Sequence, residues 1–86
     1  MIKYNSVPEI GACIFITWVD AWFMPYESMK MDGLKTYLVG FIVDKNKHGV
    51  KISVECNEEG DYRHFHFIPI GMIKSIEVLK PPMEFS

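Results

Sequence analysis

The stretch VKISVECN, residues 50–57, alternates apolar and polar side chains at every position. Successive side chains of a β-strand point to opposite faces, so this pattern predicts a strand with one buried face. The runs on either side of it, TYLVGFIVD at 36–44 and YRHFHFI at 62–68, are rich in β-branched and aromatic residues. The turn-forming segments KNKHG and NEEGD separate the three runs. Together they predict three consecutive hairpin strands, which commits the chain to a β-sheet fold.

Alternation also predicts which side chains of these strands fill the core. In 62–68 the two phenylalanines share one face, and Tyr62, His64 and His66 share the other. The predicted core of this half of the chain therefore consists of Val50, Ile52, Val54, Cys56, Phe65 and Phe67. With Phe67 fully buried, we expect the substitution Phe67→Ala to cost ~3–5 kcal/mol of stability.

Two further runs flank the hairpins. Residues 12–23, ACIFITWVDAWF, form a predicted strand that is apolar on both faces. Residues 73–79, IKSIEVL, form the last strand, which two prolines end. Five short strands without a convincing helix predict an all-β domain. A small five-stranded barrel hides more apolar surface and strand edge than a flat sheet does, and Gly40 supplies the bend that closure requires.

The whole chain, 1–86, is expected to form one domain, because 86 residues provide a single small core. Residues 1–10 form an irregular lead-in, 24–35 a long first loop, and 81–86 a C-terminal tail. Apolar residues make up 49% of the chain, which excludes a disordered protein. The net charge of -2 gives no overall basic surface for DNA or RNA, so nucleic acid is not the expected partner.

The N-terminal sequence MIKYNSVPEI lacks the apolar stretch of a signal peptide. No run reaches the ~18–20 apolar residues of a membrane helix, so no membrane association is expected. Cys13 and Cys56 form no Cys-x-x-Cys motif, and both lie in strand-like runs. We expect reduced core cysteines in a cytoplasmic protein, with a disulfide between them as the alternative. No metal or other cofactor is expected.

Trp18, Asp20 and Trp22 occupy alternate positions and would lie on one face of the first strand. One interpretation places one tryptophan in the core and the other under the long first loop. The other interpretation is a surface cluster, in which the indoles stack on a base or grip a partner and Asp20 accepts hydrogen bonds. Tyr26, in the long loop, is a candidate for the same surface.

His64 and His66 would share a strand face with Tyr62. Three such side chains ordinarily form a polar stripe that faces the solvent. A metal site with this spacing would need a third ligand, for which the candidates are His48, Glu55 and Glu58. A third interpretation is a cationic site for an anionic ligand, although Arg63 faces away from both histidines on a regular strand. The candidate ligand-binding residues are thus Trp18, Asp20, Trp22, Tyr26, Tyr62, Arg63, His64 and His66.

The stretch IPIGMIKSIEVL, residues 68–79, resembles the end of SH3-like and Sm-like small barrels, in which a tight 3-10 turn joins the last two strands. Residues 69–72 would form that turn. The stretches ITWVDAW, YLVGFIVD and VKISVEC, with this ending, resemble small proteins encoded by bacteriophages and prophages. The resemblance implies a barrel of a kind that assembles into rings and binds signalling nucleotides or host proteins. It assigns no catalytic residue.

The chain has no Gly-x-Ser-x-Gly elbow and no Gly-rich phosphate loop, so we expect no enzymatic activity. The expected function is sequestration of a small anionic host molecule, a nucleotide immune signal, as phage counter-defence in the host cytoplasm. The alternative is a protein–protein or nucleic-acid interaction module. Apolar residues on both faces of the first two strands predict a homo-oligomer, joined through strand edges and the faces around Ile14, Ile16 and Leu38.

Overall fold

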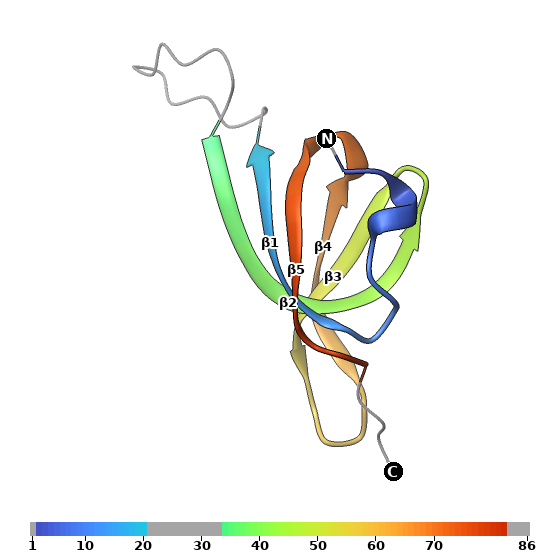
Figure 1. Ribbon diagram of the computed structural model, residues 1–86. Coiled ribbons are helices and arrows are strands. Elements are labelled where there is room, and N and C mark those ends of the chain that lie inside the picture. The colour runs from blue at the N-terminus through green and yellow to red at the C-terminus, as the bar shows by residue number, and fades with distance from the viewer. Residues whose placement is uncertain (1, 21–33, 83–86) are drawn as a thin grey trace.

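The computed structural model describes residues 2–20 and 34–82, which form one antiparallel sheet of five strands in the order β4-β3-β2-β1-β5 (Figure 1). The strands are β1 (Cys13–Asp20), β2 (Leu34–Asn46), β3 (Gly49–Cys56), β4 (Tyr62–Pro69) and β5 (Ile73–Lys80). The helices of the described residues are two short 3-10 turns, η1 (Tyr4–Ser6) and η2 (Ile70–Met72). No helix in this part of the chain has the length and apolar character needed to cross a membrane. The all-β class, the number of strands and the turn before the last strand are confirmed.

The second strand is longer than the sequence predicts. β2 extends two residues beyond each end of the predicted 36–44, since it spans Leu34–Asn46. The last two residues of the predicted loop 24–35 are therefore part of the sheet, and the rest of that loop lies outside the described residues.

β2 is shared between two neighbours. Its residues 34–41 pair with β1, and its residues 41–46 pair with β3. Gly40 lies where the partner changes, and a Cβ atom there would sit 2.5 Å from Cγ2 of Ile52 and 2.6 Å from the backbone oxygen of Ser53. A register irregularity between Ile42 and Asp44 adds a bulge just beyond it. β2 therefore curves strongly, as Figure 1 shows, and Gly40, the residue predicted to supply a bend, also lets β2 lie close to the backbone of β3.

The inner face of this curved sheet holds an aliphatic core. It consists of Val7, Ala12, Ile14, Ile16, Ile42, Val50, Ile52, Ile68 and Ile73. The N-terminal segment closes one side of this core: Nζ of Lys45 donates a hydrogen bond to the backbone oxygen of Val7 at 3.1 Å. The same ammonium group lies 5.7 Å from the ring centre of Tyr4, so one lysine ties η1 to β2.

Three residues predicted to fill the core are exposed by 41, 50 and 56%, namely Val54, Phe65 and Phe67. The register of β3 and β4 places Val50 opposite Ile68, and both are buried. The alternate residues Phe65 and Phe67 therefore belong to the outer face. Alternation groups side chains onto two faces, but the pairing with the next strand decides which group turns inward. The core predictions for Val50 and Ile52 are confirmed, and those for the three exposed residues are wrong.

The inner face of β1 holds two of the residues around which subunits were predicted to join. Ile14 and Ile16 are fully buried within the chain, and Leu38 is half-buried against the same core. The chain's own strands cover these side chains. Ile14 and Ile16 therefore offer no exposed surface to a second copy in this structure, and the homo-oligomer stays a prediction.

Both cysteines are free thiols, and each is half-buried rather than in the core. Sγ of Cys56 donates a weak hydrogen bond to the backbone oxygen of Asn57 at 3.5 Å. The alternative of a disulfide between Cys13 and Cys56 is therefore not realised in this structure.

Candidate functional site

The tryptophan and aspartate stripe is described only in part. Trp18 is half-buried on β1 and packs against the core. Its Nε1 atom is buried and has no hydrogen-bond partner among the described residues. Asp20 ends β1, and its backbone pairs with Leu34. The side chain of Asp20 and the whole of residues 22 and 26 lie outside the described residues. Of these four candidate residues, the structure therefore places the side chain of Trp18 alone, and it packs against the core.

Arg63 and His64 meet at one carboxylate near the tip of the β3–β4 hairpin. Nη1 of Arg63 lies 3.8 Å from Oε1 of Glu55, and Nε2 of His64 lies 3.4 Å from Oε2 of the same residue. A regular strand would point these two neighbours to opposite faces, but His64 has a positive φ of 59° that redirects the chain. His66 lies opposite Ile52 in the register and makes no ion pair with Glu55.

Ser53 explains how β4 tolerates this backbone conformation. The residue is fully buried, and its Oγ accepts hydrogen bonds from the backbone N–H of Arg63 at 3.0 Å and of Glu55 at 3.3 Å. The hydroxyl proton is shared between the backbone oxygens of the same two residues. The side chain thus replaces strand-to-strand hydrogen bonds where the register between Ser53–Phe65 and Glu55–Arg63 has no pair. Nothing in the sequence identifies this serine, because it occupies a polar position of a regular alternation.

Replacing His64 by glycine should leave the stability unchanged or raise it by up to ~1 kcal/mol. A left-handed backbone costs a non-glycine residue ~1–2 kcal/mol, whereas an exposed ion pair is worth ~0–1 kcal/mol. Urea unfolding measures the difference. The matched control is His66→Gly on the same strand, which should lose roughly 0.5–1 kcal/mol because its backbone is extended. Equal losses in both variants would contradict the role given to the backbone of His64.

Tyr62 packs against an aromatic ring of β2. Its ring lies 6.0 Å from the ring of Phe41, centre to centre, at an interplanar angle of 53°. Burial raises the pKa of the Tyr62 hydroxyl above its usual value of 10.0, and its electrostatic interaction with the nearby Cys56 raises it further. The hydroxyl is therefore protonated at neutral pH and carries no charge to a ligand.

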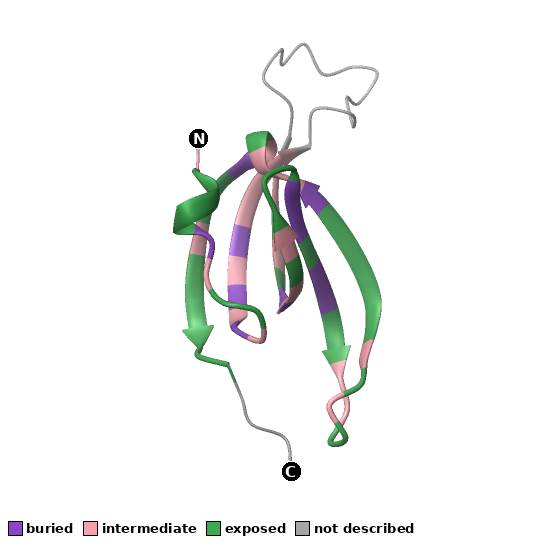
Figure 2. Cartoon of the chain, turned by 90° about the vertical axis from the view of Figure 1, so that its right-hand side faces the viewer, coloured by how far each residue is buried: buried purple, intermediate pink, exposed green. Residues whose placement is uncertain are grey.

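A surface that the sequence did not predict covers the outer face of the sheet. We define the outer face by Phe15, Tyr37, Val39, Phe65 and Phe67. The rings of Phe15 and Tyr37 stack at 5.8 Å with an interplanar angle of 20°. Where β3 and β4 contribute to this face, Nζ of Lys51 lies 4.5 Å from the ring centre of Phe65. Figure 2 shows that the exposed residues continue along most of β4. The surface was missed because its two phenylalanines were assigned to the core.

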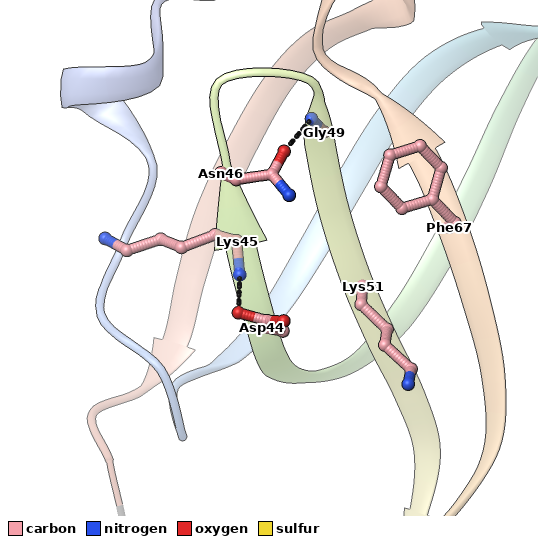
Figure 3. Close-up of a pocket in the computed structure, with 6 residues that line it drawn as sticks. All are labelled: Asp44, Lys45, Asn46, Gly49, Lys51 and Phe67. Carbon is pink, nitrogen blue, oxygen red and sulfur yellow. Dashed lines mark hydrogen bonds between the residues drawn. The ribbon is translucent and has the colours of Figure 1, made fainter.

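A pocket of about 230 Å³ borders this face at the β2–β3 turn (Figure 3). It is lined by Asp44, Lys45, Asn46, Gly49, Lys51 and Phe67, and none of the predicted site residues whose side chains the structure describes is among them. Oδ1 of Asn46 accepts the backbone N–H of His48 at 2.7 Å and of Gly49 at 3.3 Å, which fixes the turn. The ring of Phe67 occupies the space above Gly49, where a Cβ atom would lie 2.5 Å from it. The pocket thus has a polar wall, to which Asp44, Asn46 and two lysines contribute, and an aromatic wall formed by Phe67.

The metal interpretation of the histidine pair needs a third ligand. Within the part of the chain that the structure describes, no three His, Cys, Asp or Glu side chains gather closely enough to hold a metal ion. His64 contacts Glu55, but neither His48 nor Glu58 joins them. The candidate third ligands therefore do not complete a site in this conformation.

Of the eight predicted residues, the side chains that the structure describes are those of Trp18, Tyr62, Arg63, His64 and His66. The structure brings Arg63 and His64 together, leaves His66 outside their contact with Glu55, and gives Trp18 and Tyr62 to packing. Comparison of the chain with models of protein families, with curated proteins and with solved structures finds no match.

Proposed function

We propose that this chain is a non-enzymatic binding protein, an interaction module whose outer face docks a protein partner. The supporting observation is the exposure of Tyr37, Val39, Phe65 and Phe67, each by at least 50%. An antiparallel sheet with one solvated face ordinarily places polar side chains there. Exposed apolar surface that includes aromatic rings is typical of protein–protein contacts. The pocket at Phe67 offers a side chain of the partner both a polar and an aromatic wall.

We also propose that the sheet belongs to an SH3-like or Sm-like small barrel. The strand order β4-β3-β2-β1-β5, the sharing of β2 between two neighbours and the 3-10 turn between β4 and β5 support this assignment. This assignment, together with the resemblance to small phage proteins, favours a module that works in the cytoplasm of an infected bacterium. A homo-oligomer stays a prediction, with an interface that excludes the inner face.

The double substitution Tyr37→Ser/Val39→Ser should abolish partner capture from a bacterial extract while changing the stability by less than ~1 kcal/mol, because both side chains are exposed. Quantitative mass spectrometry of the captured proteins measures the loss, and calorimetry with the purified partner gives its affinity. The matched control is Val78→Ser/Leu79→Ser, which removes apolar side chains of similar exposure from β5. Identical capture by the wild type and both double variants would contradict the proposal.

Sequestration of a small anionic molecule, such as a nucleotide immune signal, is a second candidate function. The observation that favours it is the meeting of Arg63 and His64 at one point of the surface. Glu55 occupies that point, so an anion must displace a carboxylate to bind there.

Calorimetry with cyclic and linear nucleotides tests this second candidate. A nucleotide held at this point should bind more weakly to Arg63→Ala and more tightly to Glu55→Gln, which removes the competing charge. If no nucleotide gives heat of binding, or if Arg63→Ala binds as well as the wild type, sequestration at this point is wrong.

A further inference from the structure

We infer that the pocket at the β2–β3 turn binds a tyrosine side chain of the partner, with the phenol ring against Phe67 and the hydroxyl between Asp44 and Asn46. The inference rests on the proposed function and names the residue by which the partner is held. It is carried by three observations: the aromatic wall of the pocket, the two hydrogen-bonding groups on its other side, and the positions of the two lysines that line it.

Neighbouring positions of three strands form the pocket. Asp44 lies opposite Lys51, which in turn lies opposite Phe67, so the three residues form one row across β2, β3 and β4. Gly49 lies opposite Asn46 and has no side chain, so the backbone of β3 forms the floor of the pocket. In Figure 3 the ring of Phe67 stands on one side of this floor, and Asp44 and Asn46 lie on the other.

The size of the pocket and its aromatic wall limit what can fill it. A volume of about 230 Å³ is smaller than the roughly 300–1,000 Å³ of pockets for drug-sized ligands, and suits a single side chain. Phe67 is 56% exposed, so its ring is available to pack against another ring or a planar group. Tryptophan, tyrosine and arginine are the side chains that most often anchor protein interfaces. The polar wall decides among these three.

The polar wall offers one acceptor and one donor. The carboxylate of Asp44 makes no ion pair with a described residue, and the hydrogen bond it accepts comes from the backbone N–H of Lys45 at 2.8 Å. Oδ1 of Asn46 accepts the backbone N–H groups of the turn, which leaves its Nδ2 without a partner in the described part of the chain. A phenol hydroxyl both donates and accepts and therefore matches both groups, whereas an indole or a guanidinium group only donates.

The charges that line the pocket favour a neutral side chain. Nζ of Lys45 donates to the backbone oxygen of Val7 at 3.1 Å, and Nζ of Lys51 lies 4.5 Å from the ring centre of Phe65. Neither ammonium group pairs with Asp44, and Figure 3 shows Lys45 extending away from the pocket. An arginine of the partner would meet two ammonium groups for one carboxylate, and an acidic side chain would meet that carboxylate. A phenol avoids both repulsions.

Titration with N-acetyl-tyrosinamide, followed by NMR spectra of the backbone amides of the full chain, tests the inference. We expect saturable shifts at the amides of Gly49, Lys51 and Phe67, with a dissociation constant in the millimolar range because the probe is small. N-acetyl-phenylalaninamide lacks the hydroxyl and should bind at least fivefold more weakly. N-acetyl-argininamide and N-acetyl-phosphotyrosinamide should bind at least fivefold more weakly as well, because each carries a charge.

Removal of the acceptor supplies the second arm. Asp44→Ala should weaken the binding of the tyrosine amide at least fivefold and reduce the difference between the tyrosine and phenylalanine amides to less than twofold. Asp61→Ala is the matched control, because it removes an exposed carboxylate at the tip of the β3–β4 hairpin. This control should alter the affinity by less than twofold. Circular dichroism checks that both variants are folded.

Four outcomes overturn the inference. The first is equal binding of the tyrosine and phenylalanine amides to the wild type, and the second is equal weakening by Asp44→Ala and Asp61→Ala. The third is tighter binding of the arginine or the phosphotyrosine amide, because the pocket would then select a charged side chain. The fourth is the absence of saturable shifts at the amides of the pocket.

The two proposals fail separately. If partner capture depends on Tyr37 and Val39 but the tyrosine amide does not bind, the interaction module stands and the pocket is not its tyrosine site. If the tyrosine amide binds the pocket and capture is insensitive to the outer-face substitutions, the pocket inference stands and the docking surface is wrong.

Discussion

Gly40→Ala should remove about 3 kcal/mol of stability, a large share of what a domain of this size possesses. The added Cβ atom would approach Cγ2 of Ile52 to 2.5 Å and the backbone oxygen of Ser53 to 2.6 Å. The isoleucine tip has some freedom to move, but the backbone of β3 does not, because Ser53 is fully buried and hydrogen-bonded to β4. β2 and β3 would have to separate at the point where β2 changes partners.

Urea denaturation followed by circular dichroism measures this loss as a shift of the midpoint. Gly71→Ala is the matched control, because no heavy atom lies within 4 Å of the Cβ position there. Its stability should stay within ~0.5 kcal/mol of the wild type. If Gly40→Ala unfolds at the same urea concentration as Gly71→Ala, the close approach of β2 and β3 at this point is wrong.

Ile68→Ala should cost about 2–5 kcal/mol, whereas Phe67→Ala, one residue earlier, should cost only about 1 kcal/mol. Ile68 is 1% exposed and packs opposite Val50, so its removal leaves a cavity in the core. Phe67 is 56% exposed, and the contact it loses is the one over Gly49. The larger side chain thus has the smaller effect, which reverses the order that the alternation of the sequence suggests.

Thermal and urea unfolding of the two variants decide between the assignments of inner and outer face. A shift of strand register by one residue would exchange the two faces. A loss that is larger for Phe67→Ala than for Ile68→Ala would mean that β4 pairs with β3 in that shifted register.

The elements of the fold were predictable because their signals are local. Turn residues bound the strands, and the proline at 69 marks the end of β4 just before η2. The orientation of β4 was not predictable from its own residues, since Phe65 and Phe67 alternate as regularly as the true core residues do. Their face depends on which residue of β3 lies opposite Ile68, and that register is a property of two strands together.

The candidate site was predictable only as a list of residue types. The approach of Arg63 and His64 to Glu55 requires a positive φ at a histidine, for which the sequence has no signal such as glycine. The outer face was hidden by the same misassignment of β4. The pocket at the β2–β3 turn combines residues from both strands of the turn with Phe67, so it exists only once three strands are paired.

The pairing of β1 with β5 has a consequence for how the chain acquires its structure. Ile16 lies opposite Ile76, sixty residues further along the chain, whereas each of the other pairs joins two strands that are consecutive in the chain. Contacts this distant form late, because a long loop must close before they contribute. During synthesis the ribosome releases β1 well before β5 exists, so one edge of β1 stays open to other nascent chains in the interval. We expect the rate of folding, and the need for chaperones at high expression, to depend on how fast β5 docks.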